Sequence, residues 1–207
     1  MAKEKKRKVG RPSRNDSDLD ILSGSDRREQ IISVTAALFS EKGYDRTSMR
    51  DIAAATGILS GSLYYYFPSK EALFLEVHSA GMKILTNAAR EVWAATDDPW
   101  ERLEKLAAAH SKALLENSGF MIMVFPRFPE GIDAFRPELI RQRNEYESII
   151  AQAVETLDLP NGIDRSLFRL QFLGALNWSQ TWYSPKHGIS PAEIGMHLVR
   201  MLRPLRG

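Results

Sequence analysis

The fold is decided by the stretch Thr47–Phe74, TSMRDIAAATGILSGSLYYYFPSKEALF. Its apolar residues recur at helical spacing, in two short runs separated by a glycine. The pattern predicts a short helix, capped by Thr47 or Ser48 and ended by Gly57, and a second short helix that begins near Ser60. Two helices joined by a few residues that include glycine form a helix-turn-helix, a motif whose second helix enters the major groove of DNA.

The residue types within this stretch suit a DNA-reading motif. Ile52, Ala53 and Leu63 are apolar and are expected to pack the two short helices together, with Phe67 in the same core. The second helix opens with the small residues Ser60–Ser62. Small residues let the free N–H groups of a helix N-terminus approach phosphate closely.

Helical periodicity continues on both sides of this stretch, and strand-like alternation is nearly absent. Asp26 is expected to cap the first helix of the chain and Gly43 to end it. Pro68 prevents simple continuation of the second short helix, and Ser69 caps a long helix that follows. We therefore expect an all-α fold of about nine helices. Those outside the two short helices are expected at about 26–42, 69–96, 99–117, 119–127, 137–157, 164–184 and 190–204.

The composition excludes several kinds of site. The chain has 207 residues and no cysteine, so it has no disulfide, no thiolate metal site and no cysteine nucleophile. Its apolar runs are short and interrupted, and none follows the basic N-terminus as a signal peptide requires. We expect a soluble, cytoplasmic protein with no membrane partner.

Charge is distributed unevenly along the chain. The formal net charge is +2, but residues 1–14 carry seven basic side chains against Glu4, a net +6, which leaves −4 for residues 15–207. Such an arm is expected to meet a polyanion, the alternative being a solvated tail without a partner. Its Gly10-Arg11-Pro12 core resembles the AT-hook, which lies in the A·T minor groove; a non-specific electrostatic arm is the alternative.

The helix-turn-helix region itself is electrically neutral. Residues 26–72 contain six basic and six acidic side chains. Attraction to DNA phosphates must then come from local placement of charges, from helix ends and from the basic arm.

The stretch around residues 28–75 resembles the DNA-binding signature of the TetR family. The preceding segment, AALFSEKGYDRTS, matches as well. The matching features of the signature are Thr47, Ile52-Ala53, Gly57, Ser60, Gly61, Leu63-Tyr64, Phe67, Lys70 and Leu73. The resemblance implies three parts: a flexible basic arm and linker (1–25), a three-helix helix-turn-helix DNA-binding domain (26–72), and a helical ligand-binding and dimerisation domain (73–207).

The resemblance also implies roles for individual residues. Contacts with DNA phosphates or bases are implied for Thr47, Ser48, Arg50, Ser60, Ser62, Tyr64 and Tyr65, with Gly61 allowing close approach and Lys70 anchoring a phosphate. Successive helical residues point about 100° apart, so three neighbouring tyrosines cannot all read DNA, and Tyr66 is expected to be partly structural.

The C-terminal half is rich in aromatic residues and methionine, which suits a ligand cavity, although an ordinary helical core has the same composition. Expected pocket residues are Phe120, Met123, Phe128, Tyr146, Phe172, Trp178 and Trp182. In TetR-like proteins the segment corresponding to Phe120–Glu130 forms a wall between pocket and DNA-binding domain. Arg127, Arg141 and Arg169 are candidates to pair with an anionic ligand group, a surface ion pair being the alternative.

The last two helices are expected to form a dimer interface. Ile194, Leu198, Met201 and Leu202 make one apolar stripe, and Gly174 lies on the preceding helix. In TetR-like proteins the corresponding helices build a four-helix dimer interface, and two-fold symmetry matches a palindromic operator.

The sequence therefore indicates a TetR-type regulator, expected to be a homodimeric repressor released from double-stranded DNA by a small-molecule effector. The segment Gly174–Ile194 is similar to regulators of fatty-acid, branched-chain or sterol breakdown, which respond to acyl-CoA thioesters or related acids. The alternatives are an architectural DNA-binding protein without an inducer and a hydrolase acting on acyl thioesters. No catalytic residue, cofactor or metal is expected, because the histidines are scattered and no nucleophile elbow is present.

Overall fold

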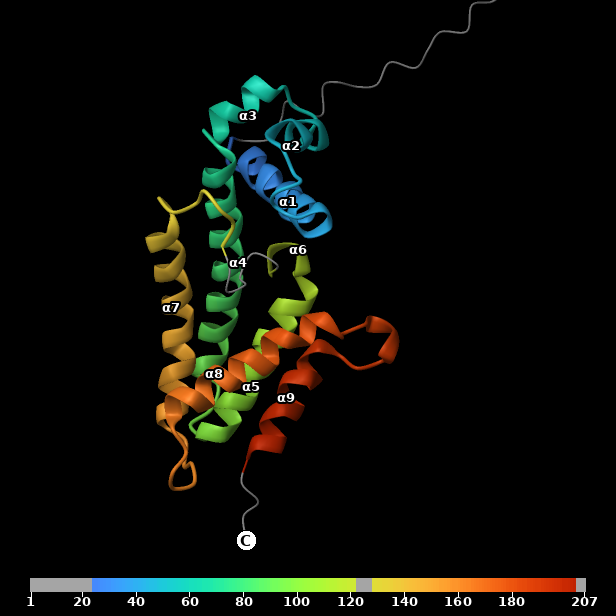
Figure 1. Ribbon diagram of the computed structural model, residues 1–207. Helices are drawn as coiled ribbons and strands as arrows, with labels where there is room; N and C mark the ends of the chain where they lie inside the picture. The colour runs from blue at the N-terminus through green and yellow to red at the C-terminus, as the bar shows by residue number, and fades with distance from the viewer. Residues whose placement is uncertain (1–23, 122–127, 204–207) are drawn as a thin grey trace, which may run out of the picture.

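The computed structural model describes residues 24–121 and 128–203, and all regular structure in these residues is helical. The α-helices are α1 (Gly24–Lys42), α2 (Met49–Thr56), α3 (Ser60–Tyr66), α4 (Lys70–Trp93), α5 (Pro99–Glu116), α6 (Ser118–Met121), α7 (Arg136–Glu155), α8 (Arg165–Trp178) and α9 (Pro191–Leu202), with 3₁₀ turns at Ser179–Thr181 and Pro185–His187. Figure 1 shows α1–α3 gathered at one end of the molecule and α5, α8 and α9 at the other. The all-α prediction is confirmed.

The N-terminal helices enclose a small core of their own. Ile52 of α2, Leu63 of α3 and Phe67 are fully or almost fully buried there, as the sequence predicts. Ser48 is the N-cap of α2 and forms a capping box with Asp51. The helix ends at Gly57, whose φ of 69° is the positive value expected of a left-handed exit. These local signals hold the two short helices at a fixed angle to each other.

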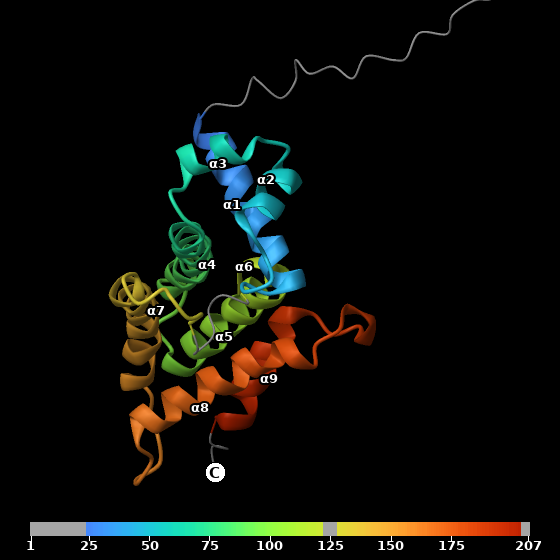
Figure 2. The ribbon, with the colours of Figure 1, turned by 45° about the horizontal axis from the view of Figure 1, so that its top comes forward.

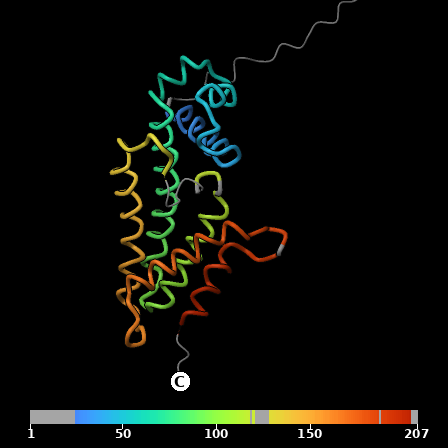
Figure 3. The backbone as a smooth tube through the Cα atoms, viewed as in Figure 1, coloured from blue at the N-terminus to red at the C-terminus, as the bar shows by residue number. Residues whose placement is uncertain are grey.

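Helix α4 connects the two ends of the molecule, as the tube in Figure 3 also shows. Ser69 caps its first turn by accepting a hydrogen bond from the Ala72 N–H at 3.1 Å. Its first turns bury Phe74 and Val77 in the N-terminal core, and its later turns bury Leu85 in the C-terminal core. One uninterrupted helix therefore belongs to both hydrophobic cores.

The C-terminal body is built around close contact between α5 and α9, with α7 beside α4 and α8 crossing below them (Figure 2). Gly195 of α9 is buried against the α5 backbone. A Cβ at Gly195 would lie 2.1 Å from the Ala107 carbonyl oxygen, so only glycine allows these two helices to approach so closely.

Three predicted helix boundaries need correction. The helix expected over 164–184 ends at Trp178, because the buried Ser179 hydroxyl bonds back to the Leu176 carbonyl at 2.6 Å and a 3₁₀ turn follows. Helix α1 begins at Gly24, so Asp26 lies in its first turn rather than at the cap. The helix expected over 119–127 is seen as the short α6, and its remainder lies outside the described residues.

The α5–α9 contact makes a stability prediction. Gly195→Ala is expected to lower the free energy of unfolding by about 3 kcal/mol, because the added methyl group forces the two helix backbones apart. Gly61→Ala on α3, where an added Cβ meets nothing within 4 Å, is the matched control and should leave stability unchanged or slightly raised. Urea unfolding followed by circular dichroism measures both; equal midpoints for the two variants would contradict the prediction.

Candidate DNA-binding surface and effector pocket

The outer face of α3 presents the predicted reading residues to solvent. Tyr65 is 87% exposed, and Tyr64 and the small residues Ser60–Ser62 are exposed beside it. Leu63 points the other way and is fully buried. Tyr66 is half-buried, and its ring meets that of Tyr65 edge-on at 5.6 Å between centroids. The helix thus has a buried side fixed by Leu63 and an open side that carries hydroxyl and aromatic groups.

The start of α2 differs from the prediction at one residue. The Thr47 side chain is buried, and its hydroxyl donates to the Gly43 carbonyl oxygen at 2.8 Å, so it closes the turn after α1 and is not available to DNA. Ser48 is exposed but uses its hydroxyl in the capping box. Arg50, two residues further, is exposed and offers a cation on this side of the motif.

Lys70 lies at the first residue of α4, where its ammonium group sits 4.0 Å from the centre of the Tyr44 ring. Burial lowers the pKa of Lys70, against the opposing effect of Asp45 and Glu71. Burial also raises the pKa of Tyr44 to about 12, and its hydroxyl lies 3.5 Å from Glu71. A cation–π contact therefore holds the predicted phosphate anchor in place.

Leu59 is a surface residue that the sequence reasoning missed. It is 80% exposed and precedes α3 as its N-cap, without a side-chain hydrogen bond to the helix. An apolar side chain at the tip of a reading helix suits contact with a thymine methyl group. The available signal was a leucine placed between the turn glycine and the first residue of the reading helix.

Inside the C-terminal body, a buried polar chain joins three helices. His110 of α5 lies 2.6 Å from the Tyr146 hydroxyl on α7 through Nδ1, and 3.2 Å from Asn177 Oδ1 on α8 through Nε2. If Nε2 donates to the Asn177 oxygen, Nδ1 accepts the Tyr146 hydroxyl proton. Burial lowers the pKa of His110 to about 4, so the imidazole is neutral at physiological pH. Beside it, the buried Ser111 hydroxyl has no hydrogen-bond partner among the residues that the structure describes.

The structure does not bring all predicted pocket residues together. Tyr146 and Phe172 are buried in the C-terminal core, whereas Phe128 packs on the N-terminal core and meets His78 edge-on at 5.9 Å. Phe120 packs against both cores. Met123, like Arg11 of the basic arm, lies outside the described residues. The described aromatic residues are therefore divided between the two cores, and Phe120 contacts both.

His78 of α4, which contacts the Phe128 ring, is also hydrogen-bonded to α7. Its Nδ1 lies 2.9 Å from Gln142 Oε1, and the Gln142 amide donates to Ser79 and Glu138 at 2.8 Å each. Burial lowers the pKa of His78. These bonds tie the middle of α4 to α7.

Trp178 and Trp182 lie on the outer surface rather than in an internal pocket, which corrects their predicted placement. Trp178 is 67% exposed, because it points away from the side of α8 that α5 and α7 cover. Trp182 lines a hollow of about 520 Å³ between α8 and α9, together with Ile194, Leu198 and Met201.

The surface of α8 and α9, with the segments beside them, carries a concentration of exposed apolar side chains. Three residues expected at the dimer interface are exposed there: Gly174, Met201 and Leu202. Further exposed apolar residues, not singled out from the sequence, are Ile163, Leu167, Leu170 and Ile189. Large exposed apolar surfaces mark association sites.

Two other kinds of site find no support among the described residues. Over 24–121 and 128–203, no three His, Asp or Glu side chains are grouped as around a metal ion. No helix within those same ranges is both long and apolar enough to cross a membrane.

Comparison with known proteins identifies the family. The sequence profile described as "Bacterial regulatory proteins, tetR family" matches residues 31–77, and the profile "Tetracyclin repressor-like, C-terminal domain" matches residues 96–205. The chain belongs to the TetR family. As a TetR-type protein, it is a DNA-binding transcriptional regulator, and α2–α3 is the helix-turn-helix of that family.

Several relatives of this TetR-family chain span nearly its whole length. The HTH-type transcriptional repressor KstR2 of Mycobacterium tuberculosis is 28% identical over 197 residues, covering 89% of this chain and 96% of the repressor. The structure of that ketosteroid transcriptional regulator has a TM-score of 0.66 at 26% identity, covering 87% of this chain and 94% of its own.

Two other TetR-fold structures superpose more closely. PfmR from Thermus thermophilus has a TM-score of 0.74 at 27% identity, covering 90% of this chain and 100% of its own. AibR in complex with isovaleryl coenzyme A and operator DNA has a TM-score of 0.72, covering 84% of this chain and 97% of its own. At 22% identity the likeness to AibR shows the shared fold alone.

The two sides of α3 predict opposite effects of mutation. Tyr65→Ala is expected to weaken operator binding about tenfold or more and to change stability by less than about 0.5 kcal/mol, because the side chain is exposed. Leu63→Ala is expected to cost about 3 kcal/mol of stability, because it empties a buried site. Fluorescence anisotropy with operator DNA and urea unfolding separate the two effects; a Tyr65→Ala protein with full affinity would contradict this assignment.

The buried His110 predicts a pH dependence of stability. Its pKa is about 4 when folded against 6.5 when exposed, so between these values the unfolded chain binds the extra proton. Lowering the pH from about 7.5 to 5 should therefore remove roughly 2 kcal/mol of the free energy of unfolding through this residue. The lowered pKa of His78 acts in the same direction.

The measurement is urea unfolding at both pH values for the parent chain, His110→Gln and the control His197→Gln, since His197 is exposed. His110→Gln should show a pH-dependent loss smaller by about 2 kcal/mol, and His197→Gln the full loss. An undiminished loss in His110→Gln would show that this residue does not cause the effect.

Proposed function

We propose that this TetR-family regulator is a homodimeric repressor which binds a palindromic operator through α2 and α3 and is released by an acyl-CoA or a related hydrophobic acid. The observation that carries the proposal is the placement of α4 in both hydrophobic cores. A ligand that changes the packing of the C-terminal core acts on the same helix that supports the DNA-binding module of residues 26–72, called the reading head below.

The DNA contacts we propose follow the exposure of the side chains. Tyr64 and Tyr65, with the small residues Ser60–Ser62 that admit the duplex closely, would face the major groove, and Leu59 would meet a thymine methyl group. Arg50 and Lys70 would contact phosphates from two sides of the motif. Because the module from 26 to 72 is neutral, the arm that contains Arg11 would add electrostatic attraction, and residues 73–207 would form the ligand and dimer unit.

The proposed dimer uses the apolar surface of α8 and α9. Ile194, Leu198, Met201 and Leu202 would pack against the same residues of a second copy, with Gly174 allowing close approach on α8. Trp178 and Trp182 would be covered by this contact. A two-fold dimer presents two reading helices to successive major grooves, about 34 Å apart.

The effector class is supported by the chemistry of the C-terminal body and by its relatives. Tyr146 and Phe172 are buried near neutral polar groups, and the Ser111 hydroxyl is buried without a partner in the described part of the chain. The interior therefore offers an apolar surface with a few hydrogen-bonding groups. KstR2 is a ketosteroid regulator, and AibR is seen with an acyl-CoA and operator DNA. Since the proposed partner is DNA, we expect the protein to act in the cytoplasm.

Release of DNA would depend on two structural connections between the C-terminal body and the DNA-binding helices. Helix α4 is the first, and the second is α6, whose Gly119 lies over the backbone of Ala36 in α1. Phe120 packs on both cores directly after this contact. An effector can shift the equilibrium only if it binds the released arrangement more tightly than the DNA-bound one.

The proposal predicts ligand-dependent release of DNA. A labelled fragment of the promoter next to the regulator's own gene should bind the dimer, and acyl-CoA thioesters or free hydrophobic acids should raise the protein concentration needed for half-saturation by about tenfold or more. Fluorescence anisotropy measures this, with Tyr65→Ala as the control whose operator binding is already weakened in the absence of effector. Unchanged DNA affinity across acyl-CoAs, steroid acids and fatty acids would contradict the effector assignment.

A further inference from the structure

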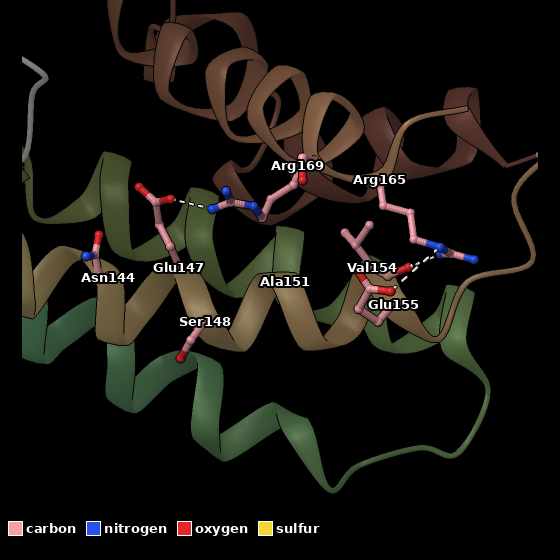
Figure 4. Close-up of a pocket in the computed structure, with 9 residues that line it drawn as sticks. Asn144, Glu147, Ser148, Ala151, Val154, Glu155, Arg165 and Arg169 are labelled. Atoms are coloured by element: carbon pink, nitrogen blue, oxygen red, sulfur yellow. Dashed lines mark hydrogen bonds and ion pairs between the residues drawn. The ribbon is translucent and has the colours of Figure 1, made fainter. Parts of the chain in front are cut away.

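Three charged side chains meet where α7 and α8 pack together. Arg169 of α8 reaches Glu147 of α7 at 2.5 Å between Nη1 and Oε2, as the dashed line in Figure 4 shows. Arg143, one turn before Glu147 on α7, lies 3.6 Å from the other oxygen of the same carboxylate. Two cations therefore share one anion.

This group is less exposed than the ordinary surface ion pairs of the chain. The side chains of Arg143, Glu147 and Arg169 are 33%, 25% and 23% exposed. In the pair between Arg90 and Glu145, which also involves α7, the exposed fractions are 60% and 42%. Excess charge removed from water is costly unless an opposite charge completes the group. One positive charge of this cluster is left without an anion among the described residues.

A second observation, at Arg143, also indicates that a hydrogen-bond acceptor is missing from this cluster. Its Nε is shielded from solvent and has no hydrogen-bond partner within residues 24–121 and 128–203, because 3.6 Å to Glu147 is too long for a hydrogen bond. Buried donors are nearly always satisfied in folded proteins. The Glu147 carboxylate accepts from Arg169 through Oε2, and its other oxygen, which faces Arg143, lies too far from Nε for a hydrogen bond.

Glu147 and Arg169 of the cluster line a groove between the two helices, and Arg143 is not among the residues that line it. The groove has a volume of about 330 Å³ and is lined by Arg165 and Arg169, by the carboxylates of Glu147 and Glu155, and by Asn144 and Ser148. Arg165 is committed to the end of α7, where it donates to the Val154 and Leu157 carbonyls. The guanidinium of Arg169 bonds only to Glu147 among the described residues and so retains donors for a ligand.

The two helices that form the groove also carry residues of the interior in which we place the effector. Glu147 follows Tyr146, the buried residue bonded to His110, and Arg169 follows Phe168, whose ring stacks with Phe172 at 6.3 Å between centroids. The same two helices thus carry apolar and neutral polar groups inward and cationic groups at the surface.

We propose that Arg169, with the positive charge of Arg143 beside the shared Glu147, forms the docking site for the anionic group of the effector. This inference rests on the proposed function. The chemistry recognised is a multi-oxygen anion, which is either the carboxylate of a free hydrophobic acid or a phosphate of a coenzyme A thioester. The anion accepts hydrogen bonds from Arg169 and completes the charge of the cluster, while the apolar part of the same molecule extends toward Tyr146 and Phe172.

Direct binding tests this site without reliance on DNA release. Isothermal titration calorimetry with the full chain uses fatty acids, a steroid acid, their coenzyme A thioesters and coenzyme A alone. Arg169→Gln and Arg143→Gln should each weaken binding of the preferred anion about tenfold or more, because a charge-assisted hydrogen bond or its charge is lost. Preference for the free acid or for the thioester identifies which anion docks.

Glu147→Gln distinguishes ligand binding from a purely structural role. Removing the competing carboxylate should tighten anion binding several-fold, whereas a structural ion cluster predicts weakening by all three substitutions. Arg90→Gln is the matched control, an exposed ion pair to the same helix, and should leave the dissociation constant unchanged. Thermal melting and operator binding without ligand show that each variant is folded.

The outcomes separate the two proposals. Unchanged binding in Arg169→Gln and Arg143→Gln, or weaker binding in Glu147→Gln, overturns the docking site while ligand-induced release of DNA still stands. Failure of every anionic probe to bind the parent chain overturns the docking site as well. Normal anion binding with no release of DNA supports the docking site and counts against the proposed effector mechanism.

Discussion

The structure depends on a single constraint: α4 is buried at both ends, in two different cores. Phe74 and Val77 cannot leave the N-terminal core, nor Leu85 the C-terminal one, without exposing apolar surface. Close-packed interiors respond to a ligand by shifting between discrete arrangements, since they do not deform continuously. Because one rigid helix is shared by two such interiors, the position of the DNA-binding helices depends on the packing of the C-terminal core.

The reading head depends on shape and placement more than on charge. Its six basic and six acidic side chains cancel, and Lys70 is held against the Tyr44 ring instead of extending freely into solvent. The exposed groups on α3 are instead hydroxyl and aromatic side chains, of which Tyr65 is the most open, and under the proposed function these make the specific contacts. A neutral head binds non-specific DNA weakly by itself, which favours discrimination between sites over general affinity for the duplex.

Most of the fold was predictable from the sequence because its signals are local. The periodicity around Ile52 and Leu63, the cap at Ser69 and the positive φ at Gly57 each depend on a few neighbouring residues. The individual DNA contacts were less predictable. A threonine hydroxyl before a helix has the same sequence signature whether it meets phosphate or, as at Thr47, the Gly43 carbonyl.

The positions of the aromatic residues in the C-terminal half were also only partly predictable from the sequence. Helix α8 has apolar residues on two sides, and periodicity does not tell which side the rest of the subunit covers. Phe172 is covered by the subunit's own core, whereas Trp178 six residues later is open to solvent. Similarly, Arg141 and Arg169 are equivalent in the sequence, but only Arg169 lies in a partly buried cluster with excess positive charge.

The arrangement of charge in the C-terminal body restricts how any amphipathic ligand is oriented. His110 and Tyr146 at the centre are neutral, because burial lowers the pKa of the imidazole and raises that of the phenol. An ionised group carried into that region would lose its hydration without finding a countercharge. Cations are instead available at the α7–α8 edge, where Arg143 and Arg169 are still reached by water. Under the proposed function, a ligand with one charged end would place its charge at this edge and its apolar part inward, toward the core that α4 shares with the DNA-binding helices.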